Sequence, residues 1–203
     1  MSQSFHQTGG WIEVVAGVMF SGKSEELIRR VRRAIIARKR VQVFKSHLDA
    51  RYAGIYSVSS HDGRTVEAIP TDSAAQIALQ IDPMAHVIAI DEAQFLDEAV
   101  IPLVTSLAGR GRRVIVAGTD TDFRGEPFGS MPALMAIAEV VDKLHAICVL
   151  CGGPASRNQR LIGGQPAPYD SPVIMVGGTD SYEARCRMCF SAPRKDAGQA
   201  SLL

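Results

Sequence analysis

Residues 17–24 combine two glycines, a lysine and a serine at the spacing of a phosphate-binding loop. The stretch GVMFSGKS places Gly17, Gly22, Lys23 and Ser24 at the fixed positions of Gly-x-x-x-x-Gly-Lys-Ser. Such glycines let backbone N–H groups surround phosphate oxygens, while the lysine reaches the β- and γ-phosphates and the serine hydroxyl binds Mg²⁺. A chance glycine-rich turn is the alternative. The apolar run before the motif and the helical pattern after it favour a P-loop that holds the phosphates of ATP.

Two adjacent carboxylates follow the apolar run VIAI. Asp91 and Glu92 would lie at the carboxyl end of a buried strand, where α/β proteins bind their ligands. In P-loop proteins an aspartate at this place holds Mg²⁺, directly or through water. Because side chains alternate along a strand, we expect Glu92 to face away from Asp91, toward a second reactant. An ordinary acidic strand end is the alternative, which the preceding P-loop disfavours.

Four cysteines form two Cys-x-x-Cys pairs, Cys148 with Cys151 and Cys186 with Cys189, separated by 34 residues. Four thiolates at this spacing suit tetrahedral Zn²⁺ and leave no open coordination position, so the metal is expected to be structural. Disulfides and a redox dithiol are the competing interpretations. The doubled motif and the absence of an export signal disfavour both.

The elements that position these residues alternate between apolar runs and helical patterns. Strands are expected at 11–17, 40–46, 86–92 and 112–119, with helices starting at Lys23 and lying between 97 and 107. This order predicts an α/β fold of the P-loop, RecA-like kind, with a largely parallel sheet flanked by helices.

The first helix carries the stretch RRVRRAIIARKR, seven basic residues in twelve. A nucleic-acid surface is one interpretation. We favour a solvated helix face, whose opposite side is the apolar stripe of Val31, Ala34 and Ile35.

Glycine, proline and cysteine become frequent near His145, and helical periodicity ends there. We therefore expect four parts: a flexible N-terminus over 1–10, a P-loop domain over 11–145, a small zinc-ribbon-like domain over 146–192 and a flexible tail over 193–203.

Charges almost cancel, with 22 basic and 21 acidic residues and a net charge of +1. Such a balance supplies no general attraction for nucleic acid or for a membrane surface. The first ten residues lack the pattern of a signal peptide, and no apolar run approaches the roughly 18 residues of a membrane-spanning helix. A soluble, cytoplasmic protein is expected.

Seven stretches, in order and spacing, resemble the thymidine kinases of the cellular, zinc-containing type. They are GVMFSGKS, FKSHLDARY, SSHDG, IDEAQF, GTDTDFRGEPFG, CGGPASRNQRL and VGGTDSYEARCRMCF. The resemblance extends from about Trp11 to Ala192. Two residues depart from the family pattern: Val18 stands where proline is usual, and Thr119 stands where an aliphatic residue is usual. The second departure is expected to alter one wall of the base pocket.

The resemblance implies phosphoryl transfer from ATP to the 5′-hydroxyl of thymidine, giving dTMP and ADP for DNA precursor synthesis by nucleoside salvage. Glu92 matches the family's general base, and Asp91 would hold Mg²⁺ together with Ser24. The 11–145 part would be the kinase domain, and the zinc-binding part would be a lasso that closes over the nucleoside. The implied nucleotide-binding residues are Gly17, Val18, Met19, Phe20, Ser21, Gly22, Lys23, Ser24, Asp91, Glu92, Ala93 and Gln94.

The resemblance also implies an apolar nucleoside pocket, because a flat pyrimidine packs on aromatic faces. Its implied residues are Met19, Phe95, Phe123, Phe128, Val173, Ile174, Met175, Val176, Gly177 and Tyr182. Arg51 and Arg124 are candidates for phosphate contact, and His61 and Asp62 match the family without an assigned role. Further implications are deoxyuridine as an alternative substrate, feedback inhibition by dTTP and a homotetramer.

Two other classes of function remain open at this point. A P-loop ATPase whose zinc module acts on nucleic acid would also explain the ATP site and the four cysteines. A nucleotide-binding switch without catalysis would explain the P-loop alone, but it has little need for Glu92. Nucleic-acid-stimulated ATP hydrolysis would favour the former, and nucleoside-dependent ADP release would favour the kinase.

Overall fold

The computed structural model describes residues 9–46, 57–59, 65–174 and 181–193. Most of the two terminal segments expected to be flexible lies outside these ranges. So do six of the residues singled out above, namely Arg51, His61, Asp62, Met175, Val176 and Gly177.

A six-stranded parallel sheet forms the body of the molecule, in the order β5-β2-β6-β7-β1-β8. The four central strands are those expected from the apolar runs, and they confirm the α/β fold. The two edge strands, β5 and β8, were not expected. The strands are β1 (Trp11–Gly17), β2 (Val41–Ser46), β5 (Ile69–Thr71), β6 (Val87–Asp91), β7 (Arg113–Gly118) and β8 (Val140–Leu144).

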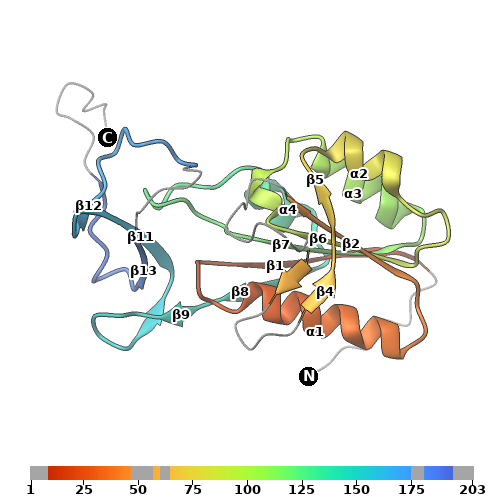
Figure 1. Ribbon diagram of the computed structural model, residues 1–203, viewed down its shortest axis with the longest axis horizontal. Helices are drawn as coiled ribbons and strands as arrows, with labels where there is room; N and C mark the ends of the chain where they lie inside the picture. Colours follow the sequence, from red (N-terminus) through yellow and green to blue (C-terminus); the bar gives the residue numbers. More distant parts are fainter. Residues whose placement is uncertain (1–8, 47–56, 60–64, 175–180, 194–203) are drawn as a thin grey trace.

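Helices cover both faces of the sheet, as Figure 1 shows. Helix α1 (Lys23–Ile36) packs on one face. On the other face lie α2 (Ala74–Gln80), α3 (Val100–Gly109) and α4 (Met131–Ile137). Burial on both faces explains why β6 and β7 are nearly continuous apolar runs, whereas Glu13 interrupts the run of β1 and Gln42 and Lys45 interrupt that of β2.

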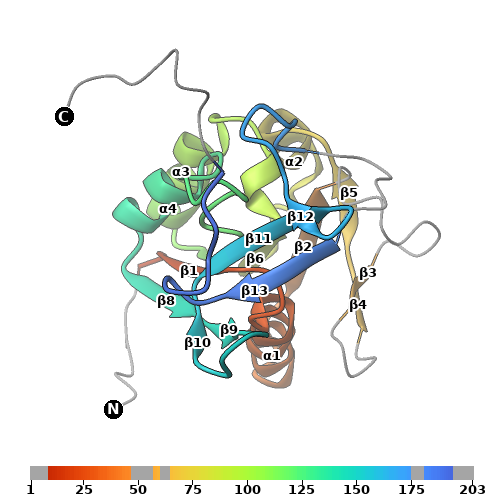
Figure 2. The same cartoon turned by 90° about the vertical axis from the view of Figure 1, so that its left-hand side faces the viewer.

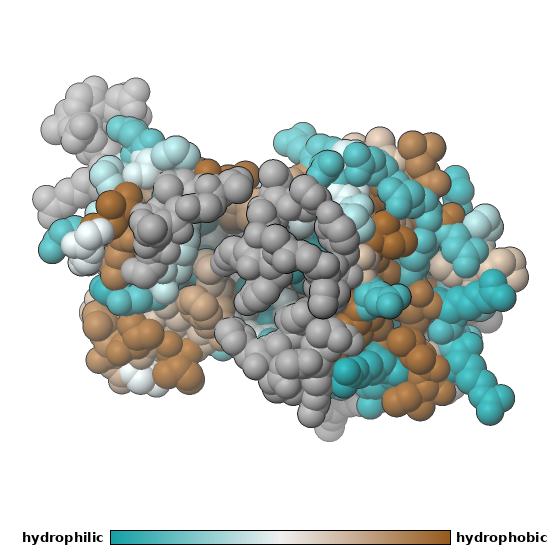
Figure 3. Space-filling model, in the orientation of Figure 1, coloured by the Kyte–Doolittle hydropathy of each residue, from teal (hydrophilic) through white to brown (hydrophobic). Residues whose placement is uncertain are grey.

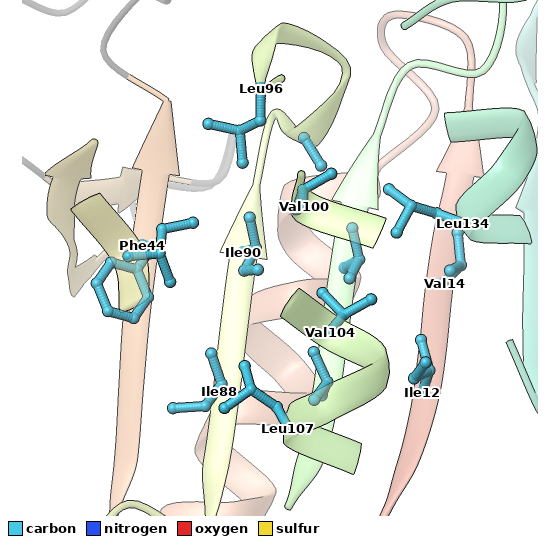
Figure 4. Close-up of a cluster of buried hydrophobic side chains, with 14 of the residues drawn as sticks. Ile12, Val14, Phe44, Ile88, Ile90, Leu96, Val100, Val104, Leu107 and Leu134 are labelled. Carbon is cyan, nitrogen blue, oxygen red and sulfur yellow. The ribbon is translucent and has the colours of Figure 1, made fainter. Parts of the chain in front are cut away.

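The larger core cluster lies between the sheet and α3 (Figure 4). Ile88 and Ile90 of β6 point toward α3, where Val104 packs on them, while the intervening Ala89 belongs to the cluster under α1. Helix α3 begins at Val100 and not at the expected residue 97. The Asp97 carboxylate explains this shift, because it accepts hydrogen bonds from the backbone N–H groups of Ala99 (3.0 Å) and Ala74 (3.2 Å).

A small β-rich module follows the last strand of the sheet. Its sheets are β10-β9 and β12-β11-β13, and Figure 2 shows β11 and β13 in front of the parallel sheet. Its strands are β9 (Ala146–Ile147), β10 (Pro154–Ala155), β11 (Arg157–Ile162), β12 (Gln165–Pro166) and β13 (Ser181–Arg185). A separate two-stranded hairpin pairs β3 (Ser57–Ser59) with β4 (Thr65–Glu67). The change of architecture between Leu144 and Ala146 falls where the composition changes.

Several exposed apolar side chains belong to this small module: Ile147, Val149, Leu150 and Met188. Figure 3 shows apolar surface at the lower left, over the region of β9. Within the described residues, no helix is both long enough and apolar enough to cross a membrane.

The basic face of α1 is not wholly solvated, contrary to our expectation. Arg30 is 7% exposed and donates hydrogen bonds to Glu13 (2.8 Å), Glu26 (2.7 Å) and Asp142. The expected apolar stripe is also shorter than predicted, since Val31 and Ala34 are buried but Ile35 is exposed. A helix pattern does not distinguish a solvated arginine from one that meets acidic residues on β1 and β8.

Glu13 is the centre of this buried ion network, at 6% exposed. Arg113 Nε donates to its carboxylate at 2.6 Å, Arg30 Nη1 at 2.8 Å and the Trp11 indole N–H at 2.6 Å. Burial alone would raise the pKa of Glu13. The hydrogen bond and charge of Arg113, with the contributions of Trp11 and Arg30, outweigh burial and lower this pKa below its ordinary value of 4.5.

Replacing Glu13 by glutamine is expected to lower the free energy of unfolding by about 3–5 kcal/mol, because the half-buried Arg113 loses the carboxylate that it binds and the buried Arg30 loses one of its three acidic partners. The native carboxylate, with its lowered pKa, stabilises the fold above about pH 4.5 and stops doing so as the pH falls through that pKa. Urea unfolding at pH 7 and at pH 4 checks both points. The exposed Glu67→Gln is the control, and an equal loss in the two variants would contradict the role of Glu13.

Candidate functional site

The loop between β1 and α1 has the backbone of a phosphate-binding loop. Gly17 ends β1 at φ 153°, and Gly22 precedes α1 at φ 85°. A Cβ on Gly17 would lie 2.6 Å from the Leu144 carbonyl oxygen and 2.8 Å from Ser21 Oγ. Glycine is therefore required at position 17 by close packing as well as by backbone conformation.

Lys23 folds back over this loop. Its Nζ donates to the Val18 carbonyl oxygen at 2.9 Å, and the residue is only 8% exposed. The ammonium group is therefore held at the loop, within which the phosphates of a nucleotide would bind.

Asp91 and Ser24 face one another at the carboxyl edge of the sheet. Ser24 Oγ donates to Asp91 Oδ2 at 3.4 Å, and Asp91 is 2% exposed. Burial and, after it, the nearby charge of Glu92 raise the pKa of Asp91 to about 7, although the charges of Lys45 and Lys23 oppose this increase. A buried carboxylate beside a hydroxyl offers two oxygen ligands and gains from a cation, so these residues fit Mg²⁺.

Glu92 lies next to Asp91, but the pleat of β6 does not set its direction. The strand ends at Asp91, and Glu92 takes a left-handed conformation, φ 55°, before the short 3-10 helix η2 (Ala93–Phe95). The expectation that strand alternation directs Glu92 was therefore wrong. The direction of this carboxylate comes from a turn, and the Gln94 amide fixes it by donating to Glu92 Oε2 at 2.5 Å.

The aromatic residues expected around the nucleoside form two groups. Phe95 and Phe128 meet edge to face, with ring centroids 5.6 Å apart. Phe123 is buried, and the Arg160 guanidinium lies 5.2 Å from its ring centre and 5.9 Å from that of Tyr182. Met19 is half-buried in the P-loop, Val173 is half-buried and Ile174 is 40% exposed.

The Arg124 guanidinium binds backbone carbonyl oxygens and packs on an aromatic ring. Its Nε donates to the Tyr169 carbonyl oxygen at 2.8 Å, and its Nη2 donates to that of Ser171 at 2.9 Å. The guanidinium also lies 4.7 Å from the Tyr169 ring centre. Arg124 thus anchors the chain just before the segment that begins at Val173.

Two polar residues of β11 connect the small module to the rest of the site, and the sequence did not single them out. Asn158 Oδ1 accepts the Met19 N–H at 2.8 Å, and Asn158 Nδ2 donates to the Thr121 carbonyl oxygen at 2.8 Å. Arg160 is fully buried and donates to the Pro172 carbonyl oxygen at 2.6 Å. Polar residues in a strand normally indicate exposure, so no sequence pattern could have found them.

The four cysteines come together as expected for a metal centre. Their sulfur atoms all lie within 4.8 Å of one another, and Cys151 Sγ is 3.7 Å from Cys186 Sγ. Four sulfurs around Zn²⁺ at about 2.3 Å would be about 3.8 Å apart, so the cluster fits tetrahedral zinc.

Backbone N–H groups around the sulfurs prepare the cluster for thiolates. Those of Cys186 and others near Cys148 lower the pKa of the Cys148 thiol to about 6. Hydrogen bonds with the neighbouring thiols Cys186 and Cys151 raise the pKa of Cys189 to about 12. The four thiols cannot all ionise readily beside one another, and a divalent cation would remove that conflict.

Replacing Cys186 by serine is expected to reduce bound zinc from one ion per chain to near zero. Because Val18 of the P-loop is buried in one cluster with Cys148, on which Cys186 packs, loss of the metal should also weaken nucleotide binding. Elemental analysis and nucleotide titration measure the two effects. Met188→Leu, an exposed change between two of the cysteines, is the control and should keep its zinc. Wild-type protein without zinc after purification under reducing conditions would refute the assignment.

Together, a parallel sheet, a phosphate-binding loop and acidic residues at the adjacent strand end define a P-loop protein that binds a nucleoside triphosphate. The family model for thymidine kinase matches residues 10–190. The chain therefore belongs to the thymidine kinase family.

Among solved structures, the X-ray structure of the ATPase DotB of Legionella pneumophila is similar to part of this chain. The match is 19% identical with a TM-score of 0.38, and it covers 64% of this chain. The chain spans 35% of the length of that protein. Likeness at this level carries no argument about function.

Proposed function

We propose that this protein is an ATP:thymidine 5′-phosphotransferase, which converts thymidine and ATP to dTMP and ADP. One observation supports this most strongly. Two carboxylates are adjacent at the end of β6: Asp91 accepts a hydrogen bond from the P-loop serine, and Glu92 accepts one from Gln94. Such a pair can serve a metal and an acceptor hydroxyl separately, which nucleotide binding alone does not need.

In the proposed reaction the backbone of 17–24 surrounds the phosphates of ATP, and Lys23 neutralises charge on the β- and γ-phosphates. Ser24 and Asp91 would hold Mg²⁺, which neutralises further phosphate charge when bound. Phosphoryl transfer requires positioning and charge neutralisation more than covalent help from the protein, so these groups supply most of the catalysis.

On the acceptor side, Glu92 takes the proton of the 5′-hydroxyl as its oxygen attacks the γ-phosphorus. Phe95, Phe128, Phe123 and Tyr182 supply apolar and aromatic faces for the pyrimidine. The two aromatic groups described above support this assignment, together with the anchoring of the chain before Val173 by Arg124 and Arg160.

A nucleoside panel tests the proposal. ADP release is followed with ATP and Mg²⁺ in the presence of thymidine, deoxyuridine, deoxycytidine or deoxyadenosine, or of single-stranded DNA or RNA. We expect release to depend on thymidine, with deoxyuridine as the next best substrate. ADP release that is stimulated by nucleic acid and does not depend on nucleosides would instead establish a nucleic-acid-dependent ATPase. Inhibition by dTTP and assembly into a homotetramer are further proposals, which rest on the family resemblance.

A further inference from the structure

The buried amide of Gln94 occupies a place between two functional segments. Gln94 is 5% exposed and belongs to η2, directly after Glu92 and Ala93. Its Oε1 accepts the Thr119 N–H at 2.9 Å, and its Nε2 donates to Glu92 Oε2 at 2.5 Å. One side chain thus joins the backbone just after β7 to the carboxylate that follows β6.

The orientation of this amide has one solution. A backbone N–H can only donate, so the atom facing Thr119 must be the amide oxygen. The NH₂ group then faces Glu92, whose ionised carboxylate can only accept. The flipped amide would set donor against donor and acceptor against acceptor, so the backbone of Thr119 decides what Gln94 presents to Glu92.

Close packing surrounds Gln94. A Cβ at Gly118 would lie 2.7 Å from Gln94 Oε1, so glycine lets the backbone approach the amide there. A Cβ at Gly129 would lie 2.3 Å from the Gln94 backbone oxygen, so a second glycine lets the backbone approach the Gln94 main chain. A buried side chain with both polar ends bonded has little freedom to take another rotamer.

Glu92 needs such a support because its own surroundings leave it adjustable. The residue is half-buried, and its backbone is at φ 55°, a turn conformation with no strand neighbour to direct the side chain. Within the described part of the chain, the side-chain hydrogen bond to this carboxylate comes from Gln94 and engages Oε2. The bond leaves Oε1 as the oxygen that can meet an acceptor hydroxyl.

We infer that Gln94 is a positioning residue, which aims the Glu92 carboxylate at the acceptor hydroxyl and holds it there. This inference rests on the proposed function. It gives Gln94 a role through Glu92 and not through the nucleotide, to which the family resemblance had assigned it. Residue 119 takes part as well, because its backbone N–H donates to Gln94 and so fixes the orientation of the amide. This contribution does not depend on the side chain at position 119.

Gln94→Met tests this role, because it keeps the length of the side chain and removes both hydrogen bonds. Turnover of thymidine is expected to fall about tenfold to a hundredfold, the scale of a misplaced catalytic group. The KM values for ATP and thymidine should change little, since neither substrate loses a contact.

A double-mutant cycle separates positioning from general loss of structure. If Gln94 acts through Glu92, Gln94→Met should hardly lower the turnover any further in a protein whose Glu92 is already replaced by glutamine. The matched control is Gln159→Met, another fully buried glutamine whose Nε2 donates to the Ser191 carbonyl oxygen (3.2 Å) and whose Oε1 accepts the Ser191 N–H (2.8 Å). Any loss that Gln159→Met causes should multiply with the loss from Glu92→Gln.

The outcomes are distinct. A Gln94→Met loss that multiplies fully with Glu92→Gln, or a rise in the KM for ATP with unchanged turnover, overturns the inference while leaving the kinase assignment intact. A wild-type protein that phosphorylates no nucleoside overturns both. If Gln94→Met lowers stability, the rates are divided by the folded fraction, which is measured by circular dichroism. The coupling in the double-mutant cycle is then calculated from the corrected rates.

Discussion

Glu92→Gln is expected to lower the turnover of thymidine phosphorylation by about a hundredfold or more, the usual scale for a positioned general base. The substitution keeps the size of the side chain and can keep a hydrogen bond with Gln94, but it removes the basic oxygen. ATP affinity should barely change, because Lys23, Ser24 and the loop backbone remain. Single-turnover kinetics and nucleotide titration measure the two quantities.

The control for this change is Glu98→Gln, at an exposed position before α3. It should retain wild-type turnover. Unchanged turnover of Glu92→Gln in an assay limited by the chemical step would refute the role of Glu92 as the base.

Lys23→Ala should reduce turnover by about 100- to 1000-fold, because it removes a preorganised positive charge from the phosphate site. The side chain is held against the Val18 carbonyl oxygen, so its charge costs little reorganisation when the nucleotide binds. ATP affinity should fall as well, unlike in Glu92→Gln. Steady-state kinetics with ATP titration distinguishes the two variants.

The exposed Lys39→Ala, in the turn after α1, is the matched control and should leave both quantities unchanged. Near-normal turnover of Lys23→Ala would mean that the loop from Gly17 to Ser24 is not the catalytic phosphate site.

The parts of the structure that sequence could predict are those governed by local rules. The central strands β6 and β7 are buried on both faces, so their apolar runs are nearly continuous and easy to recognise, and those of β1 and β2 are interrupted by only one or two polar residues. The P-loop depends on glycine conformations at fixed spacing. The four cysteines met because two Cys-x-x-Cys turns can share one metal, however long the segment between them.

The parts that sequence could not predict depend on partners far along the chain. Arg30 is buried because it meets Glu13 and Asp142 on the neighbouring strands β1 and β8, a contact that the helix pattern does not encode. The edge strand β8, Val-Val-Asp-Lys-Leu, is short, carries two consecutive charged residues and has no buried residue, so it lacks the apolar run of a central strand. Arg124 binds backbone carbonyls of residues 169 and 171, so its role depended on the fold of a segment without periodicity.

Within the candidate site, the direction of Glu92 was the main error of sequence reasoning. Strand alternation stops where the strand stops, and β6 stops at Asp91. The left-handed turn at Glu92 and the amide of Gln94 then set the geometry, and neither leaves a mark on hydrophobic periodicity. Asn158 and Arg160 were missed for a related reason, because their partners lie in the P-loop and in residues 121 and 172.

Analysis of the reaction products tests the central claim most directly. The protein is incubated with ATP, Mg²⁺ and thymidine, and ³¹P NMR and mass spectrometry identify each phosphorus-containing product. The proposed function predicts thymidine 5′-monophosphate and ADP in equal amounts, formed about 100- to 1000-fold more slowly by Lys23→Ala. ADP accompanied by inorganic phosphate, with thymidine recovered unchanged, would contradict it.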